Sequence, residues 1–329
     1  MPSSAAPEPI GIAIVGLGHW GPNLLRNISD DPRSKVIYAV DVSAERLSLV
    51  ANRYPNVTRT ASLQVALDDP SVTGVIIATP ASTHYQIARQ ALNAGKHCLV
   101  EKPLATSQGE ARDLVALAET RHLRIAVGHV FLYNAAIRRV KRYLDAGDLG
   151  QVHYISMART NLGPPGIDVD VVWDLATHDV SIANYWLQGP PTHVAAQGGS
   201  WITPGKVDTV FATLSYATGQ LVHIVASWLN PRKVRDIVVV GSRYMVTVDD
   251  LNQVEPLRIY DKGIDPELTP PFIDTYGEFR ASVRDGDIHI PHVFLASIHR
   301  PGAAEGRERA GEPSKAGRWL AGPSPEGHD

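Results

Sequence analysis

The sequence has almost no cysteine, no long hydrophobic run and no excess of basic charge. Its single cysteine, Cys98, excludes a disulfide framework, a zinc ribbon or an iron–sulfur cluster built from this chain alone. No apolar stretch approaches the roughly 18 residues of a membrane span, so we expect no membrane partner. Lys and Arg number 31 against 34 Asp and Glu, a net charge of −3, which argues against nucleic-acid binding through a generally basic surface.

Both ends of the chain lack the composition of a folded segment. Residues 1–9, MPSSAAPEP, have neither the positive start nor the apolar centre of a signal peptide, so we expect a disordered lead on a cytoplasmic protein. Residues 300–329 contain 6 Gly and 4 Pro, with Trp319 and Leu320 as their only large apolar side chains. Such a segment cannot bury enough surface to offset its ordering entropy, and we expect a disordered tail.

The remaining chain is long enough for two domains, with 44% hydrophobic and 20% charged residues over the 329 positions. Its first half alternates apolar strands with helices, which predicts a doubly wound parallel sheet covered on both faces. We expect strands at 10–16, 35–41, 74–80, 97–103 and 124–131, and helices at 43–54, 81–95 and 107–121. Ser107 followed by Glu110 is a capping-box pattern at the start of the last helix.

After about residue 150 the pattern changes to strands that follow one another with few helices between. Expected strands lie at 151–160, 193–201, 209–219, 220–229, 235–250 and 256–261, with one helix around 173–186. Two hairpin-like links, 217–219 and 241–243, indicate a largely antiparallel sheet. The second half is therefore a separate α+β domain, with a boundary near residues 125–150.

A glycine motif follows the first strand. Residues 16–21, GLGHWG, match G-x-G-x-x-G between an apolar strand and a plausible helix, which is the context that makes the motif informative. Glycines there allow a tight turn, a close approach to a pyrophosphate and close packing of helix on strand. The residues of this expected dinucleotide site are Gly16, Gly18, His19, Trp20 and Gly21.

Asp41 ends the next strand, 20 residues after Gly21. Its carboxylate would accept hydrogen bonds from the adenosine ribose and repel a 2′-phosphate, which favours NAD over NADP. Arg46 lies near enough in sequence to assist a phosphate, so NADP stays the less favoured alternative.

Glu101-Lys102-Pro103 follows the fourth strand, where ligands of doubly wound sheets bind. Lys102 would project toward the nicotinamide, as a proton donor or an electrostatic anchor for a hydroxyl that becomes a carbonyl. Pro103 would allow a cis peptide bond before it. The alternative is a solvated Glu–Lys pair at the end of a strand.

Asp174 and His178 stand four residues apart at the start of the expected second-half helix. An imidazole that titrates near neutrality suits acid–base work at a carbinol, and a nearby carboxylate would orient it or bind substrate hydroxyls. The alternative is an N-terminal capping Asp with an unrelated His. No third ligand has convincing spacing, so we expect no metal site.

Together GLGHWG, ATPASTHY, VEKPLA and WDLATHD, in this order, resemble the Gfo/Idh/MocA oxidoreductase family from about Ile10 to Asp285. The resemblance implies a Rossmann domain over 10–130, followed by a substrate and oligomerisation domain over 131–290 with a large open sheet. It also implies a homodimer or homotetramer. Family members have an apolar helix where this chain continues into its Gly- and Pro-rich tail.

The resemblance also assigns roles to individual residues. The family's catalytic lysine falls on Lys102, and its D-x-x-x-H pair falls on Asp174 and His178. The segment that lines the cofactor falls on Ala78, Thr79, Pro80, His84 and Glu101. Substrate-binding positions fall on Asn134, Arg159 and Asn161, together with Asp174.

The function implied is an NAD-dependent oxidoreductase that acts on a secondary hydroxyl or ketone of a sugar. Residues 171–187 look most like the sugar-nucleotide 3-dehydrogenases and 3-ketosugar reductases of the family, so we expect a nucleotide-linked sugar as substrate. One alternative is an inositol or simple aldose dehydrogenase of the same fold. Another is a non-catalytic NAD-binding sensor, and a carbohydrate-binding module without cofactor conflicts with the glycine turn and Asp41.

Overall fold

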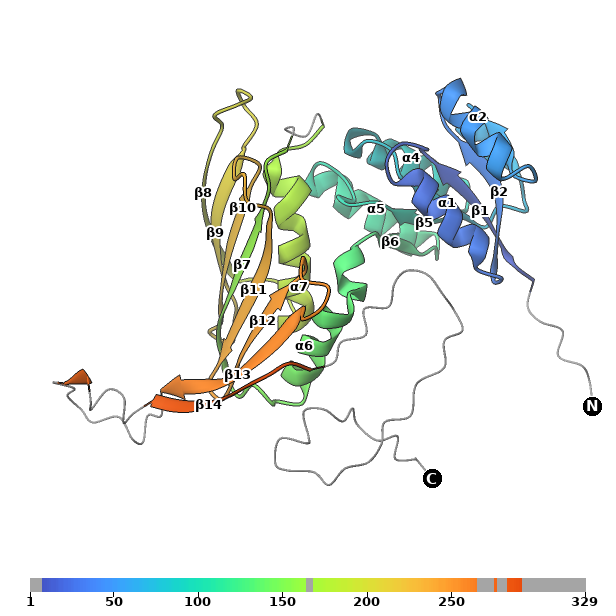
Figure 1. Cartoon of the computed structure of the whole chain (residues 1–329). Helices are drawn as coiled ribbons and strands as arrows, with labels where there is room; N and C mark the ends of the chain where they lie inside the picture. Colours follow the sequence, from blue (N-terminus) through green and yellow to red (C-terminus); the bar gives the residue numbers. More distant parts are fainter. Residues whose placement is uncertain (1–7, 164–167, 265–274, 277–282, 292–329) are drawn as a thin grey trace, which may run out of the picture. The chain divides into compact units, whose positions relative to one another are not determined.

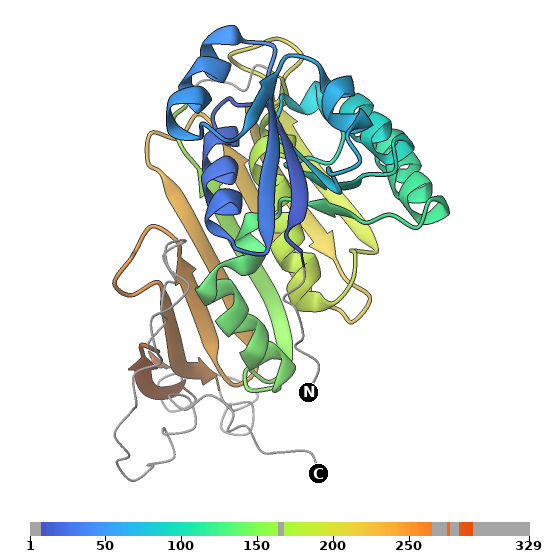
Figure 2. The same cartoon turned by 90° about the vertical axis from the view of Figure 1, so that its right-hand side faces the viewer.

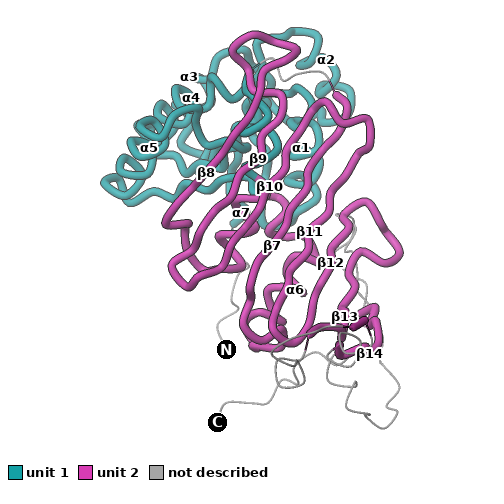
Figure 3. The backbone as a smooth tube through the Cα atoms, turned by 90° about the vertical axis from the view of Figure 1, so that its left-hand side faces the viewer, with its two compact units in different colours: residues 1–129, 166–177 teal, residues 130–165, 178–329 magenta. Residues whose placement is uncertain are grey.

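The computed structural model describes residues 8–163, 168–264, 275–276 and 283–291. The chain divides into two compact units, residues 1–129 with 166–177 and residues 130–165 with 178–329 (Figure 3). The chain therefore enters the second unit at residue 130, returns to the first unit for residues 166–177 and then completes the second unit. Of the lead and tail expected at the two ends, only Glu8 and Pro9 are described, and both are exposed.

The first unit is built around a six-stranded parallel sheet in the order β3-β2-β1-β4-β5-β6, of which Figure 1 labels β1, β2, β5 and β6. The order reverses between β1 and β4, and in such sheets the crevice beyond the carboxyl ends of the strands at the reversal binds ligands. The strands are β1 (Ile10–Val15), β2 (Ser34–Val40), β3 (Thr58–Thr60), β4 (Gly74–Ile77), β5 (His97–Val100) and β6 (Ile125–Val127). The doubly wound sheet predicted from the sequence is confirmed.

Helices cover both faces of this sheet (Figure 2). Helices α1 (Gly21–Asp30) and α2 (Ala44–Arg53) pack on one face, and α3 (Leu63–Asp68), α4 (Ala81–Asn93) and α5 (Gln108–Thr120) pack on the other. Successive strand residues point to opposite faces, which is why every β1 side chain can be apolar.

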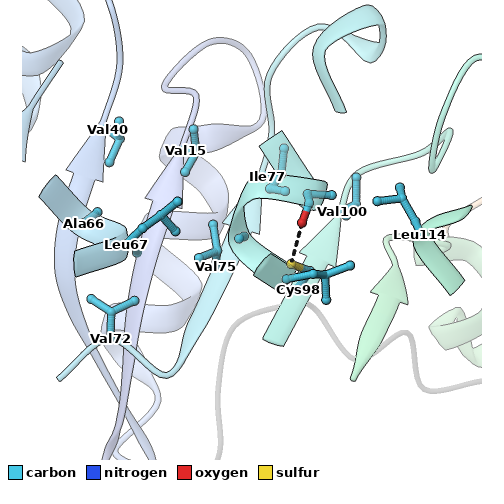
Figure 4. Packing of buried hydrophobic residues seen from close by; sticks show 14 of the residues in the cluster. Val15, Val40, Ala66, Leu67, Val72, Val75, Ile77, Cys98, Val100 and Leu114 are labelled. Atoms are coloured by element: carbon cyan, nitrogen blue, oxygen red, sulfur yellow. Dashed lines mark hydrogen bonds between the residues drawn. The ribbon is translucent and has the colours of Figure 1, made fainter. Parts of the chain in front are cut away.

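The hydrophobic core between this sheet and helices α3, α4 and α5 also holds the single cysteine. Val15, Ile77, Val100 and Leu114 pack around it (Figure 4). Cys98 lies among them with 5% exposure, which makes it a packing residue of the core.

The second unit is built around an eight-stranded sheet in the order β14-β13-β12-β11-β7-β10-β9-β8. All neighbours are antiparallel except β7 and β10, which run parallel. The strands are β7 (Val152–Thr160), β8 (His193–Gly199), β9 (Thr209–Ser215), β10 (Leu221–Ser227), β11 (Val234–Gly241), β12 (Met245–Asp249), β13 (Leu257–Ile264) and β14 (Val283–His289). The mainly antiparallel second sheet is confirmed.

One face of this sheet carries two helices, α6 (Ala135–Asp145) and α7 (Thr177–Leu187) (Figure 1). The Trp186 indole Nε1 donates to the Ile137 carbonyl oxygen at 3.0 Å and joins α7 to α6. The opposite face is open: Tyr154, Phe211 and Leu221 are 46%, 50% and 48% exposed. Strand β8 is exposed along most of its length.

Some local predictions are confirmed and others need correction. The Ser107 hydroxyl accepts from Glu110 N at 3.2 Å as the N-cap of α5, and the Lys102–Pro103 peptide bond is cis. The strand expected at 124–131 ends at Val127 because its pairing with β5 ends there, and a 3-10 turn, η1 (Val130–Tyr133), follows. Helix α6 and the short elements β3 and α3 had no counterpart in the sequence prediction.

Candidate active site

The glycine turn joins β1 to α1, and its backbone conformation requires glycine at two positions. Gly16 has a φ of +92°, and a Cβ there would lie 2.6 Å from the Ala78 carbonyl oxygen. A Cβ at Gly21 would lie 2.0 Å from the Gly16 carbonyl oxygen. Helix α1 begins at Gly21 with Pro22 in its first turn, so the positive end of the helix dipole lies at the glycine turn and favours an anion there.

A cavity of about 660 Å³ opens beyond the carboxyl ends of β1, β2 and β4. Its size is that of a small-molecule site, and its walls are mainly apolar with a few polar side chains. Of the predicted cofactor residues it brings together Gly16, Gly18, His19, Trp20, Asp41, Ala78, Thr79 and Pro80. Gly21, His84, Glu101 and Lys102 do not line it.

Asp41 is held rigidly at the edge of this cavity with 6% exposure. Its Oδ2 accepts from Leu17 N at 2.7 Å, within the glycine turn, and its Oδ1 accepts from Ser43 N at 2.8 Å, at the start of α2. Arg46 Nη1 lies 3.5 Å from Oδ2. Each carboxylate oxygen keeps a lone pair, so the group fits hydroxyl donors of a ribose.

His84 is buried in α4 and connects two loops. Its Nδ1 lies 2.7 Å from the Pro103 carbonyl oxygen and its Nε2 lies 2.9 Å from the Thr79 carbonyl oxygen. The ring therefore ties the cavity wall at Thr79 to the loop that carries Lys102. Because the ring is only 1% exposed and does not line the cavity, it contacts the cavity wall from the protein side.

Lys102 meets Asp174 across 72 residues of sequence. Lys102 Nζ donates to Asp174 Oδ1 and to the Asp174 carbonyl oxygen, both at 2.8 Å. The two side chains are 17% and 36% exposed. Asp174 lies in a π-helical turn, η2 (Val172–Ala176), that leads into α7, and Lys102 forms its ion pair with this residue. The catalytic roles of Lys102, Asp174 and His178 stay predictions.

Two further titratable side chains of the first unit, Glu101 and His129, interact with Lys102. Burial raises the pKa of Glu101, whose Oε2 accepts from Lys102 N at 3.3 Å and whose carboxyl group packs on Gly128. Burial, and then the positive charge of Lys102, lower the pKa of His129. The sequence analysis missed His129, although it follows β6 just as Lys102 follows β5, and the carboxyl ends of parallel strands meet at one edge.

His178 lies in the first turn of α7 in the second unit, with 8% exposure. The ring of Phe131 lies 4.8 Å from its ring, centroid to centroid, at an interplanar angle of 70°. The Arg159 guanidinium carbon lies 4.3 Å from the Phe131 centroid. The sequence analysis did not single out Phe131.

The three other residues predicted to bind substrate make contacts inside the second unit. Arg159 is 3% exposed and donates from Nε and Nη2 to Asp179 Oδ1, at 3.0 and 2.8 Å. Asn134 caps α6 and donates from Nδ2 to Asp250 Oδ1 at 2.8 Å. Asn161 accepts from Arg235 Nη2 at 2.8 Å. Substrate binding by these residues stays a prediction.

Two features are absent from the described ranges. Among the helices placed in them, none is long and apolar enough to cross a membrane. The same ranges contain no group of three or more His, Cys, Asp or Glu side chains that could hold a metal ion.

Comparison with known proteins gives the same family for both halves of the chain. Residues 10–129 match the model of an oxidoreductase family with an NAD-binding Rossmann fold, and residues 137–247 match the GFO/IDH/MocA C-terminal domain. The first region spans the six-stranded sheet, and the second runs from α6 through β11 of the eight-stranded sheet into β12.

Named relatives extend the similarity over most of the chain. The UDP-N-acetylglucosamine 3-dehydrogenase of Acidithiobacillus ferrooxidans is 30% identical over 256 residues, covering 76% of each chain. The NAD-dependent scyllo-inositol 2-dehydrogenase of Bacillus subtilis is 26% identical over 308 residues, covering 87% of this chain and 90% of the relative. The crystal structure of GenD2 from gentamicin A biosynthesis, in complex with NAD, superimposes with a TM-score of 0.71 at 30% identity, covering 78% of this chain and 76% of GenD2.

Proposed function

The chain belongs to the Gfo/Idh/MocA family of NAD-binding oxidoreductases, and from this premise we propose that it transfers a hydride between NAD and a secondary hydroxyl of a nucleotide-linked sugar. The observation that carries the proposal is the Lys102–Asp174 pair at the carboxyl end of β5. It holds a cation at the edge of the sheet where ligands of this fold bind. The similarity to a UDP-N-acetylglucosamine 3-dehydrogenase supports the substrate class.

The cavity of the first unit fits NAD. Gly16 and Gly18 would let the backbone approach the pyrophosphate, whose charge would face the N-terminus of α1. Asp41 would accept hydrogen bonds from the adenosine ribose, and residues 78–80 would line the cofactor farther along. When bound, NAD accepts the hydride in oxidation, and its reduced form donates it in the reverse direction.

We assign the proton chemistry to Lys102, Asp174 and His178. An ammonium has three N–H donors, and Asp174 takes two of those on Lys102, which leaves one for the substrate oxygen. In oxidation the carbinol carbon loses its hydride, His178 takes the hydroxyl proton, and the oxygen becomes a carbonyl that Lys102 polarises. In reduction His178 returns the proton. Asp174 holds the Lys102 ammonium group in position in both directions of the reaction.

Absorbance at the reduced-nicotinamide band, with NAD and a panel of nucleotide sugars, cyclitols and aldoses, tests the function. Lys102→Ala should lower turnover by about 100-fold or more, the usual size of an acid–base or electrostatic contribution, while calorimetry finds NAD binding nearly unchanged. Lys262→Ala is the matched control, because Lys262 is a half-exposed lysine that pairs with Asp285 within the second unit. Near-normal turnover of Lys102→Ala would remove Lys102 from the mechanism.

A second candidate is a cyclitol dehydrogenase, favoured by the similarity to a scyllo-inositol 2-dehydrogenase over nearly the whole of that relative. The same panel separates the two, because a cyclitol lacks the nucleotide. If NAD binds and no compound of this panel is turned over, a panel of keto sugars with NADH follows. Absence of turnover there too would favour a non-catalytic NAD-binding sensor or an enzyme impaired by its atypical C-terminal segment.

The open face of the eight-stranded sheet supports assembly into a homodimer or homotetramer. Tyr154, Phe211 and Leu221 expose large apolar side chains on neighbouring strands of this face. Light scattering after size exclusion should give a multiple of the 35.6 kDa chain mass, and Phe211→Lys should shift it toward the monomer. A monomeric wild type would refute the assembly.

We also propose a cytoplasmic location for the enzyme. A free thiol in the core, at Cys98, suits a reducing compartment. Fractionation of the source cells should recover the protein with cytoplasmic markers, and recovery in a secreted or membrane fraction would contradict this location.

A further inference from the structure

Phe131 is the one aromatic ring in the described chain with contacts to both His178 and Arg159. Its ring lies edge-on to the imidazole at 4.8 Å and within 4.3 Å of the guanidinium carbon. The three side chains come from η1, β7 and the first turn of α7, all in the second unit. Such contacts favour defined geometries, since the ring has a negative face and a positive edge.

Arg159 is in turn fixed to the residue that follows His178. Both its Nε and its Nη2 donate to Asp179 Oδ1, and the two side chains are 4% and 2% exposed. The cost of removing both charges from water offsets much of the attraction between them, so a buried pair of this kind is weak evidence of a stabilising role. What it does supply is a fixed distance between β7 and the first turn of α7.

The Asp179 carboxylate is only half satisfied. Its Oδ2 is buried and has no hydrogen-bond partner among the residues that the structure describes. Burial raises the pKa of Asp179 against the opposing influence of Arg159 and Arg235. An apolar pair of the same shape would avoid this cost, so the retained pair suggests a use for its geometry.

We propose that Phe131 and Arg159 are positioning residues for the His178 imidazole: Arg159 fixes the first turn of α7 through Asp179 and supports the Phe131 ring, and that ring sets the orientation of the imidazole. The proposal rests on the proposed function only in giving His178 the acid–base role. It also gives Arg159 a task that needs no contact with substrate, in contrast to the substrate-binding role expected from the family resemblance.

The test combines a spectrum with kinetics. The full-length protein is labelled with ¹³C in its histidine rings, and the His178 signal is assigned by its loss in His178→Gln. Phe131→Leu removes the ring current and should move that signal. It should also lower kcat by about 10–100-fold, the effect of a misplaced catalytic group, with KM for NAD and substrate within about twofold of wild type. Phe131→Tyr keeps the ring and should keep both the signal and kcat.

Tyr133→Leu is the matched control. Tyr133 belongs to the same 3-10 turn, is 74% exposed and contacts Arg138. Its removal should leave the His178 signal and kcat unchanged. Arg159→Lys is a second variant of the arrangement around Phe131. It keeps the charge but loses one of the two hydrogen bonds to Asp179, so it should move the His178 signal and lower kcat in the same direction as Phe131→Leu.

Three results would overturn the proposal. One is an unmoved His178 signal in Phe131→Leu. Another is a moved signal with unchanged kcat, since orientation would then be irrelevant to turnover. The third is a rise in substrate KM with the signal unmoved, which makes Phe131 a substrate contact. If His178→Gln itself retains kcat, the acid–base role in the proposed function fails, and the spectra still report the contact between Phe131 and His178 independently of it.

Discussion

Replacing Asp41 should weaken both the fold of the first unit and its hold on NAD. In Asp41→Ala the amides of Leu17 and Ser43 lose their acceptors in a site that is 6% exposed. A buried donor left without a partner costs about 1–3 kcal/mol, so the two together should lower the free energy of unfolding by about 3 kcal/mol. The loss of the ribose acceptor adds a separate effect on cofactor affinity.

Urea denaturation followed by far-UV circular dichroism measures the first effect. With a slope of about 2 kcal/mol per molar urea, the midpoint of the first unit should fall by about 1.5 M. Calorimetry should find NAD bound about 10–100-fold more weakly, and discrimination against NADP reduced, because the carboxylate that repels a 2′-phosphate is gone while Arg46 remains.

Glu45→Gln is the control for charge alone. Glu45 lies in the first turn of α2, exposed, four residues after Asp41. Its loss should change stability by no more than about 0.5 kcal/mol. If Asp41→Ala shifts the urea midpoint no further than Glu45→Gln does, the two backbone hydrogen bonds contribute nothing measurable, and the reasoning above is refuted.

Two further predictions concern buried groups of the first unit. Burial raises the pKa of the Cys98 thiol to about 12, so a thiol reagent at neutral pH should label it only after denaturation, and rapid labelling of the native protein would contradict its burial. Because the pKa of Glu101 is raised, the folded state binds that proton more tightly than the unfolded state, and stability falls as pH rises through the titration of this group. Glu101→Gln should therefore gain stability relative to wild type between pH 4.5 and 7 in urea titrations, and a constant difference across that range would argue against the raised pKa.

The features that the sequence predicted well are local ones. The strand, glycine turn and helix around Gly16–Gly21, with Asp41 at the end of the next strand, follow from steric and hydrogen-bonding requirements that a short window contains. The same holds for the cap at Ser107. The alternation of buried strands with helices was enough to predict the doubly wound sheet, because that pattern has few solutions.

Elements without a strong local signal were missed. Helix α6 buries Ala136, Ile137, Val140 and Tyr143 on one face, but its basic residues and the lack of a long apolar run concealed this spacing. The ion pairs Lys102–Asp174 and Arg159–Asp179 join residues 72 and 20 positions apart, and only the tertiary fold decides such partners. The Phe131 contacts depend on how η1 lies against β7 and α7, which no sequence period encodes.

The central position of β7 has a consequence for how the second unit acquires its structure. Val152–Thr160 pairs with Leu221–Ser227 on one side and with Val234–Gly241 on the other. During synthesis this strand leaves the ribosome well before either partner exists, with Ile155 and Met157 unburied until then. Strand β7 must close long loops to reach these partners. The entropy of loop closure is lost before the strand contacts form, and this slows folding. The eight-stranded sheet therefore forms late, and a nascent chain halted before Gly241 exposes an apolar strand that chaperones would recognise.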